Sequence, residues 1–246
     1  MFYELQTAWR TIRREGLKPL FQKVFLYFRQ IGWALRFTTL RKPYGASPPD
    51  AVAFSFDTAG DLIGPSQYRS EALQLAKLVG ERKPRVVVEI GTAKGGTLCI
   101  WCALADPAAT VVSIDLPGGM HGGGYPGWKT LVYKQFAQPT QRLHLLRVDS
   151  HLPATRDRLK TLLPGQIDFL FIDGDHTYDG VKTDFEMYSP LVKKGGLVAF
   201  HDICNHVPEA KCDVDKFWNE IRGRYRSWEF IENPGQRIYG VGVLEL

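Results

Sequence analysis

Short apolar runs alternate with segments of helical period along most of the chain. The apolar runs cover residues 86–88, 110–114, 143–148, 167–172 and 195–200. Their near-continuous apolar character is typical of strands that are buried on both faces of a parallel sheet. Apolar residues at helical spacing follow between the runs and precede the first of them. The pattern therefore predicts an α/β fold with a doubly wound, mostly parallel sheet.

The same pattern predicts further elements on both sides of these strands. Helices are expected at about residues 66–81 and 213–225, and residues 51–60 are expected to be a short extended segment. Residues 228–232 and 238–246 flank the turn sequence Asn-Pro-Gly-Gln and predict a C-terminal antiparallel hairpin.

Three regions follow from these elements. Residues 1–42 read as a basic amphipathic helical extension. Residues 43–65 begin with a stretch rich in Pro, Gly and Ser, and we interpret them as a linker and the segment that leads into the domain. Residues 66–246 hold all the predicted strands and form the α/β domain.

A glycine-rich turn follows the first strand, with the spacing Glu-x-Gly-x-x-x-Gly. Glycine allows a sharp backbone turn and the close approach of a ligand. The spacing matches neither the dinucleotide fingerprint nor the phosphate-binding loop, and a strand-end carboxylate suits a ligand with hydroxyl and amino groups. We therefore take Glu89, Gly91, Thr92 and Gly95 as candidate cofactor residues. The alternative is a tight turn with no ligand.

The next strands also end in polar residues, and the carboxyl ends of such strands line one crevice. Asp115 ends the second strand, where the acid of a mononucleotide-binding half takes the ribose hydroxyls. Asp149 and Ser150 end the third strand and are further candidates for this crevice. Asp149 can also be a helix N-cap, and the two roles are compatible.

The ends of the fourth and fifth strands carry the most reactive side chains. Asp173 ends an apolar strand, where an aspartate can bind a hard divalent ion. His176 lies three residues later, and its imidazole titrates near neutral pH, so it can take a proton from a hydroxyl group. His201 and Asp202 end the neighbouring strand. A purely structural histidine is the alternative for His176.

A resemblance to a known family rests on these motifs together. Val-Val-Glu-Ile-Gly-Thr-Ala-Lys-Gly-Gly-Thr, Ser-Ile-Asp-Leu-Pro, Arg-Val-Asp-Ser, Phe-Ile-Asp-Gly-Asp-His-Thr-Tyr and Gly-Gly-Leu-Val-Ala-Phe-His-Asp resemble the class I S-adenosylmethionine-dependent methyltransferases. The resemblance covers about residues 50–246 and is greatest to the cephalosporin-hydroxylase-like and sugar O-methyltransferase branch. It implies a seven-stranded Rossmann-like methyltransferase fold with S-adenosyl-L-methionine as cofactor, whose adenine end would lie at Asp149 and Ser150.

The resemblance also implies chemistry for the strand ends. His176 would be the catalytic base beside Asp173, which also borders the cofactor. Asp173 and Asp202 would hold Mg²⁺ or another divalent cation. Metal-dependent relatives often show an acid where this chain has His201, and imidazole suits transition metals better than Mg²⁺. Whether a metal binds therefore stays open, with His201 as a candidate ligand.

The implied function is transfer of a methyl group to a hydroxyl of a small molecule, glycan or glycolipid. N-methylation is a neighbouring alternative. A second alternative is a non-catalytic S-adenosylmethionine-binding or scaffold protein of the same fold. A nicotinamide oxidoreductase is disfavoured because the Gly-x-Gly-x-x-Gly fingerprint is missing from the turn.

Positive charge is concentrated in the extension. Residues 1–42 hold nine Lys/Arg and two acids, a net +7, so the rest of the chain carries −2 of the overall +5. This balance argues against a nucleic-acid partner for the α/β domain. Lys23, Arg29 and Arg36 interrupt the apolar stretch, which does not offer the roughly 20 uncharged residues of a membrane span.

Two placements of the extension remain open. Packing on the body or on a second subunit of a homo-oligomer is favoured. Peripheral contact with an anionic bilayer, such as the inner membrane surface, is the alternative.

The number and spacing of the cysteines bear on the redox compartment and on a possible zinc site. Four cysteines in 246 residues give no disulfide framework, which predicts a reducing cytoplasm. Cys204 and Cys212 lie near His201 and His206 in the sequence, but their spacing fits no usual zinc pattern. A zinc site is therefore not expected.

A loop rich in glycine follows Asp115. Residues 116–129 contain six glycines and two prolines. They form either a lid over the ligands or a plain surface loop.

Overall fold

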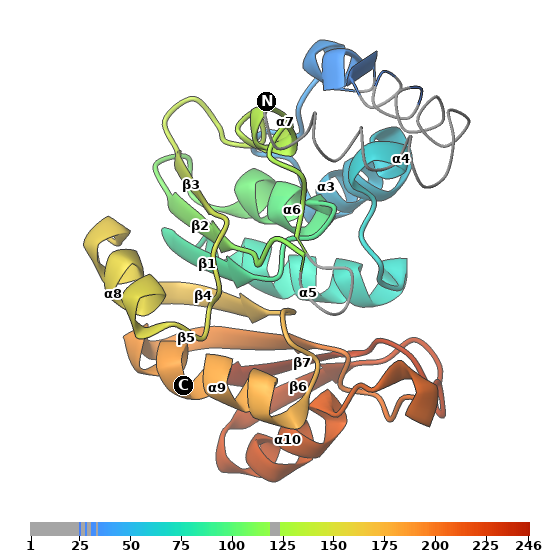
Figure 1. Ribbon diagram of the computed structural model, residues 1–246, viewed down its shortest axis with the longest axis vertical. Helices are drawn as coiled ribbons and strands as arrows, with labels where there is room; N and C mark the ends of the chain where they lie inside the picture. Colours follow the sequence, from blue (N-terminus) through green and yellow to red (C-terminus); the bar gives the residue numbers. More distant parts are fainter. Residues whose placement is uncertain (1–24, 26–27, 29–30, 33, 119–123) are drawn as a thin grey trace, which may run out of the picture. The chain divides into compact units, whose positions relative to one another are not determined.

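The computed structural model describes residues 25, 28, 31–32, 34–118 and 124–246 (Figure 1). The chain divides into two compact units, Met1–Arg41 and Lys42–Leu246. In the first unit residues 34–39 are helical, and most of the predicted amphipathic extension lies outside the described residues. Within the part of the chain that is described, no helix has the length and apolar character needed to cross a bilayer.

The second unit is built on a seven-stranded sheet in the order β3-β2-β1-β4-β5-β7-β6 (Figure 1). The first five strands run parallel, and β7 pairs antiparallel with both β5 and β6. The predicted doubly wound sheet and its C-terminal hairpin are therefore confirmed. The strands are β1 (Val86–Ile90), β2 (Thr110–Ile114), β3 (Arg142–Leu146), β4 (Ile167–Ile172), β5 (Val192–His201), β6 (Arg226–Phe230) and β7 (Val241–Glu245).

Helices cover both faces of this sheet. On one face α8, α9 and α10 close a core that includes Leu159, Phe185 and Trp218. On the other face Trp101 of α6 packs edge-on against Phe169 of β4, with ring centroids 5.0 Å apart. The helices are α3 (Pro48–Ala53), α4 (Gly60–Ile63), α5 (Arg69–Arg82), α6 (Gly96–Leu104), α7 (Lys129–Tyr133), α8 (Pro153–Leu162), α9 (Tyr178–Tyr188) and α10 (Val214–Ile221).

The prediction of an extended segment at residues 51–60 is wrong, because this segment is helical. It comprises α3, a π-helical turn (Phe54–Thr58) and the start of α4. Ser47 caps α3 by accepting the N–H of Asp50, and proline occupies the first helical positions, where a missing N–H costs nothing. Ala51 and Val52 of α3 are buried, so tertiary packing overrode the extended conformation that the local apolar alternation had predicted.

Candidate active site

The carboxyl ends of the parallel strands surround a cavity of about 360 Å³. This is the crevice in which ligands bind to open α/β sheets. Its lining brings together most of the candidate cofactor, catalytic and metal residues that the sequence predicted. Those on the predicted cofactor side are Gly91, Thr92, Gly95, Asp115, Asp149, Ser150 and Asp173, and those on the other side are His176, His201 and Asp202.

The glycine turn is shaped by two close backbone approaches. Gly91 has a φ of +88°, and a Cβ there would lie 1.8 Å from the carbonyl oxygen of Asp173. Gly95 has a φ of +90°, and a Cβ there would lie 2.7 Å from the Tyr133 ring. Both positions need the left-handed conformation that only glycine adopts freely. The turn is therefore held against the end of β4 and the Tyr133 ring, and both glycines line the cavity.

Glu89 is placed differently from the other predicted cofactor residues. Its side chain is fully buried and, in the described structure, is absent from the cavity lining. It accepts hydrogen bonds from the Thr92 hydroxyl at 2.8 Å and from the Trp101 indole N–H at 3.0 Å. Burial raises the pKa of Glu89 to about 8. The contacts that are visible hold the turn in place, and a contact of Glu89 with the cofactor stays a prediction.

The two acids after β2 and β3 are oriented by backbone N–H groups. A carboxylate oxygen of Asp115 accepts the N–H of Ala93 at 3.2 Å, which fixes it beside the glycine turn. Burial raises the pKa of Asp115 to about 6. Asp149 accepts the N–H of His151 at 2.9 Å, whereas the N-cap of α8 is Leu152. Asp149 is thus not the N-cap of that helix, and its side chain borders the cavity.

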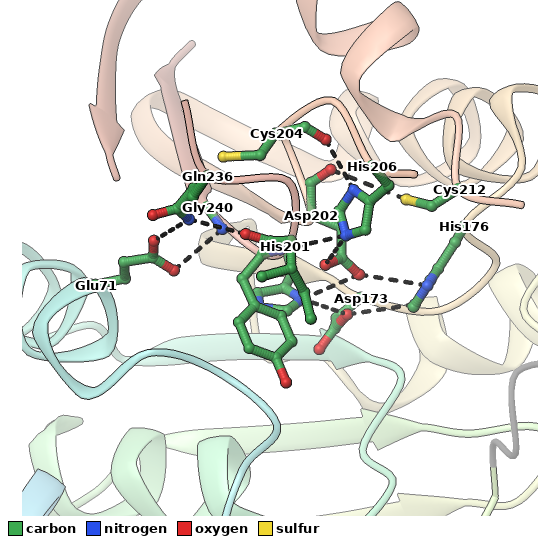
Figure 2. Close-up of polar contacts among 12 residues, drawn as sticks. Glu71, Asp173, His176, His201, Asp202, Cys204, His206, Cys212, Gln236 and Gly240 are labelled. Atoms are coloured by element: carbon green, nitrogen blue, oxygen red, sulfur yellow. Dashed lines mark hydrogen bonds and ion pairs between the residues drawn. The ribbon is translucent and has the colours of Figure 1, made fainter. Parts of the chain in front are cut away.

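The carboxyl ends of β4 and β5 bring two carboxylates and two imidazoles together (Figure 2). The Nδ1 atom of His201 lies 3.2 Å from Asp173 Oδ1 and 3.2 Å from Asp202 Oδ2. The Nδ1 atom of His176 lies 3.3 Å from the same Asp202 oxygen. Asp202 has a φ of +64°, a costly conformation for a non-glycine residue that is common at functional sites.

The charges in this cluster support one another. Burial alone would raise the pKa of Asp202, but the imidazoles of His201, His206 and His176 outweigh it and hold that pKa well below its usual range. Burial lowers the pKa of His176, yet Asp173 and Asp202 together raise it above its ordinary value. The cluster therefore combines ionised carboxylates with histidines that hold their protons more tightly than usual.

Two neighbours of the cluster were not predicted from the sequence. The Nε2 atom of His206 lies 3.1 Å from Asp202 Oδ1. Tyr239 lines the cavity, with its ring 5.4 Å from the His201 ring. His206 follows Asp202 by four residues, a proximity that the sequence does display. Tyr239 has no local signal, because only the return of the hairpin brings it to the site.

A histidine and an aspartate lie close together beside the predicted adenine end of the cavity. His151 lines the cavity, and its Nε2 atom lies 3.5 Å from a carboxylate oxygen of Asp184, whose side chain is fully buried in α9. This partner raises the pKa of His151 to about 9. Neither residue was predicted from the sequence, since the two are far apart in the chain.

The loop after β2 is described only in part. Residues 119–123 lie outside the described residues, so the prediction of a lid stays a prediction. After them, Tyr125 is buried and packs edge-on against Tyr133 at 4.7 Å. This end of the loop is therefore anchored to the domain.

The predicted metal residues fit a divalent cation by their position and chemistry. Ligand atoms of Asp173, His201 and Asp202 lie within 4.8 Å of one another. His201 is 4% exposed, and within the described residues neither of its ring nitrogens has a hydrogen-bond partner of good geometry. Two carboxylates with an imidazole can hold a cation, and the imidazole favours a transition metal over Mg²⁺.

Comparisons with known proteins agree with this geometry. Residues 88–203 match the family model of a methyltransferase domain. An uncharacterized protein of Sinorhizobium fredii is 30% identical over 171 residues, which cover 68% of this chain and 18% of that protein. The chain thus spans less than a fifth of the length of that relative.

Two solved structures share the fold. The MycE methyltransferase of mycinamycin biosynthesis, in complex with Mg, SAH and mycinamycin VI, has a TM-score of 0.54 and 16% identity, with 83% of this chain and 55% of that chain covered. A TDP-rhamnose 3′-O-methyltransferase of calicheamicin biosynthesis has a TM-score of 0.52 and 20% identity, with 70% and 76% covered. Residues 88–203 thus match a methyltransferase domain, and the sheet order and strand-end cavity are those of the class I S-adenosylmethionine-dependent methyltransferase fold.

Proposed function

We propose that this protein transfers the methyl group of S-adenosylmethionine to a hydroxyl oxygen of a small molecule or a sugar. The observation that carries the proposal is one continuous cavity, whose lining runs from the glycine turn after β1 to the imidazole and carboxylate cluster after β4 and β5. A methyl donor and a proton acceptor can therefore meet in the same space. The narrower assignment to the cephalosporin-hydroxylase-like branch stays a prediction.

The cofactor is assigned to the half of the cavity formed by β1, β2 and β3. Gly91 and Gly95 line this half of the cavity, where the absence of a side chain lets a ligand approach the backbone closely. Asp115, held by the N–H of Ala93, is positioned to accept the ribose hydroxyls. Asp149 and Ser150 border the adenine end.

His176 is assigned as the base that takes the proton of the acceptor hydroxyl. Its Nδ1 atom lies 3.3 Å from Asp202 Oδ2, and its Nε2 atom lies 3.6 Å from Asp173 Oδ1. These carboxylates orient the ring and stabilise the imidazolium that forms when the proton arrives. Because the methyl donor is already activated, holding the acceptor oxygen in line with it supplies much of the rate.

A divalent cation, when bound, would be held by Asp173, His201 and Asp202. It would supply a positive charge that lowers the pKa of an acceptor hydroxyl. The MycE complex contains Mg, and it supports this assignment only through the shared fold.

The acceptor class rests on the two structural neighbours and on the cavity. One neighbour is named for TDP-rhamnose, and the other is complexed with mycinamycin VI. We propose an acceptor of this general kind, a hydroxylated small molecule or sugar. A homo-oligomer and peripheral membrane contact through residues 1–42 both stay predictions.

Calorimetric titration with S-adenosylhomocysteine, with and without Mg²⁺, tests the proposal. We expect micromolar binding, about −8 kcal/mol. Replacing Asp115 with Asn should weaken it at least about tenfold, since one charge-assisted hydrogen bond is lost. The matched variant Asp213→Asn changes a half-buried acid outside the cavity lining and should bind normally. Absence of binding to the wild-type protein would contradict the proposal.

A further inference from the structure

A titratable side chain in the cofactor half of the cavity has no role in the proposed function. His151 lines the cavity directly after Asp149 and Ser150. Its Nε2 atom lies 3.5 Å from Asp184 Oδ1, and within the described residues neither atom has a hydrogen-bond partner of good geometry. We propose that His151 binds the cofactor: as an imidazolium kept beside Asp184, it donates a hydrogen bond from Nδ1 to a ring nitrogen of the adenine. This inference rests on the proposed function, because it needs S-adenosylmethionine in the cavity.

The segment that carries His151 is held by its neighbours. The N–H of His151 donates to Asp149 Oδ1 at 2.9 Å. The Thr155 hydroxyl of α8 donates to the carbonyl oxygen of Asp149 at 2.6 Å. The Tyr188 hydroxyl of α9 donates to the carbonyl oxygen of Ser150 at 2.5 Å. The imidazole therefore starts from a fixed backbone at the cavity wall, next to the carboxylate of Asp149.

Asp184 lies directly beneath the cavity lining. Its side chain is fully buried in α9, and a Cβ at Gly174, which lines the cavity, would lie 3.4 Å from its Oδ2 atom. An ionised carboxylate in such a place is costly unless a cation pairs with it. His151 is the partner that the structure provides.

The acids that face His151 favour its protonated form. Asp184 of α9, with smaller contributions from Asp149 after β3 and Asp175 after β4, raises the pKa of His151 to about 9. Burial raises the pKa of Asp184 as well, and His151 opposes that rise. The pair therefore retains a proton at neutral pH, and the partly exposed imidazole is its more basic member.

Two further titratable groups lie on the helices around this segment. Arg156 of α8 pairs with Asp157 at 3.4 Å. Burial raises the pKa of the Tyr188 hydroxyl on α9, so this phenol stays neutral at physiological pH. The three acids around His151 outweigh the single cation of Arg156.

Adenine offers a donor and acceptors side by side. Its exocyclic amino group donates, and the ring nitrogens N1 and N7 on either side of that group accept. Asp149 can accept from the amino group, and a cationic His151 beside it can donate to the neighbouring ring nitrogen. The Nε2 atom of His151 is buried against Asp184, whereas Nδ1 is accessible. In the neutral imidazole the hydrogen would stay on Nε2, and Nδ1 would no longer be a donor.

Calorimetric titration with deaza analogues of S-adenosylhomocysteine tests this hydrogen bond. Analogues in which C–H replaces N1, N3 or N7 each lack one acceptor. At pH 7 we expect either the N1 or the N7 analogue to bind wild-type protein at least about tenfold more weakly than S-adenosylhomocysteine. In His151→Leu, S-adenosylhomocysteine should bind no better than that analogue. The N3 analogue is the matched control ligand, because N3 lies away from the amino group.

The pH profile tests the part of Asp184. The preference over the weak analogue should hold below about pH 9 and disappear above it, because the donor is lost with the proton of His151. Asp184→Asn should move this midpoint toward 6.5. His144→Leu changes a histidine of β3 outside the cavity lining and should leave preference and midpoint unchanged. A ratio of two ligands is used because the ionisation of their shared methionine portion cancels.

Failure of this inference and failure of the proposed function give different results. Wild-type protein that does not bind S-adenosylhomocysteine contradicts the proposed function itself. Wild-type protein that binds it, but has the same preference among the analogues as His151→Leu, overturns this inference alone, since a purely structural histidine would affect all the ligands equally. Thermal unfolding verifies the fold of each variant. If His151→Leu does not fold, a wild-type preference that stays constant from pH 7 to pH 10 overturns the inference.

Discussion

Glu89 and Asp202 are carboxylic acids at the ends of two strands of one sheet, and their pKa values are shifted in opposite directions. Both are buried, with exposed fractions of 0% and 5%. Burial raises the pKa of Glu89 to about 8, because its partners Thr92 and Trp101 are neutral. Burial acts on Asp202 as well, but three imidazoles reverse it and lower the pKa. Burial alone makes a neutral, structural acid, and burial among cations makes a charged one.

The same contrast extends to the two halves of the cavity. The cofactor half depends on backbone conformation at Gly91 and Gly95, where side chains would clash. The other half depends on titratable side chains such as His176 and His201, which can be replaced without a change in the backbone conformation. Substitution of either glycine should therefore reduce stability, whereas substitution of a titratable side chain in the second half should reduce chemistry.

The largest expected effect is on stability at the glycine turn. Gly91→Ala should lower the free energy of unfolding by more than about 4 kcal/mol, because its Cβ would meet the Asp173 backbone at 1.8 Å. Gly118→Ala is the matched control, with a φ of +78° but no described atom within 4 Å. It should cost only about 1 kcal/mol. Urea unfolding at equal protein concentration measures both, and similar losses would contradict the role assigned to the close approach at Gly91.

His176→Gln should have its effect on chemistry. We expect methyl transfer to fall by about 100- to 10,000-fold, with thermal stability and S-adenosylhomocysteine binding preserved. Formation of S-adenosylhomocysteine with a panel of nucleotide sugars and catechols measures turnover. A base must be deprotonated, and the pKa of His176 is raised above 6.5, so the wild-type rate should increase with pH through a midpoint above that value. A variant that retains the wild-type rate would remove His176 from the mechanism.

Substitution of Glu89 should have an effect of intermediate size on the free energy of unfolding. Glu89→Ala should destabilise the protein by about 3 kcal/mol, because the Thr92 and Trp101 donors lose their acceptor and a small void remains. Glu89→Gln should cost less than about 1 kcal/mol, since the native acid is already mostly protonated at pH 7.

The pH dependence of stability shows whether Glu89 is neutral or ionised in the folded protein. Its folded pKa is above the ordinary value of 4.5, so its contribution to stability falls as pH rises from 4.5 through about 8. Glutamine does not titrate, and its stability relative to wild type should therefore improve across that window. Chemical unfolding at several pH values measures the difference, and a constant difference would show that Glu89 is ionised.

The smallest expected effect concerns His206 in metal-free protein. Asp202→Asn should lower the pKa of His206 from about 10 toward 6.5, by more than one unit or about 1.4 kcal/mol. The pKa is raised in the folded state, so the wild-type contribution is full below pH 6.5 and is lost as pH rises through about 10. Proton NMR titration follows the ring, and Asp213→Asn should leave it unchanged.

Local sequence patterns predicted much of the fold and of the site. Buried parallel strands need short apolar runs, and the turn after β1 needs glycine at Gly91 and Gly95, so both are visible in the chain. The ends of parallel strands meet at one edge, and for this reason the amino-acid sequence by itself predicts that Asp115, Asp173 and Asp202 lie together.

Tertiary structure alone decided what those side chains do. Packing turned residues 51–60 into helix and directed Glu89 toward Trp101 instead of the cavity. Folding also brought Tyr239 and the thiol of Cys212 to the cluster from distant segments. Spacing along the chain cannot report burial or the charge of a neighbour from another strand, and these two quantities set whether a buried acid is neutral or ionised.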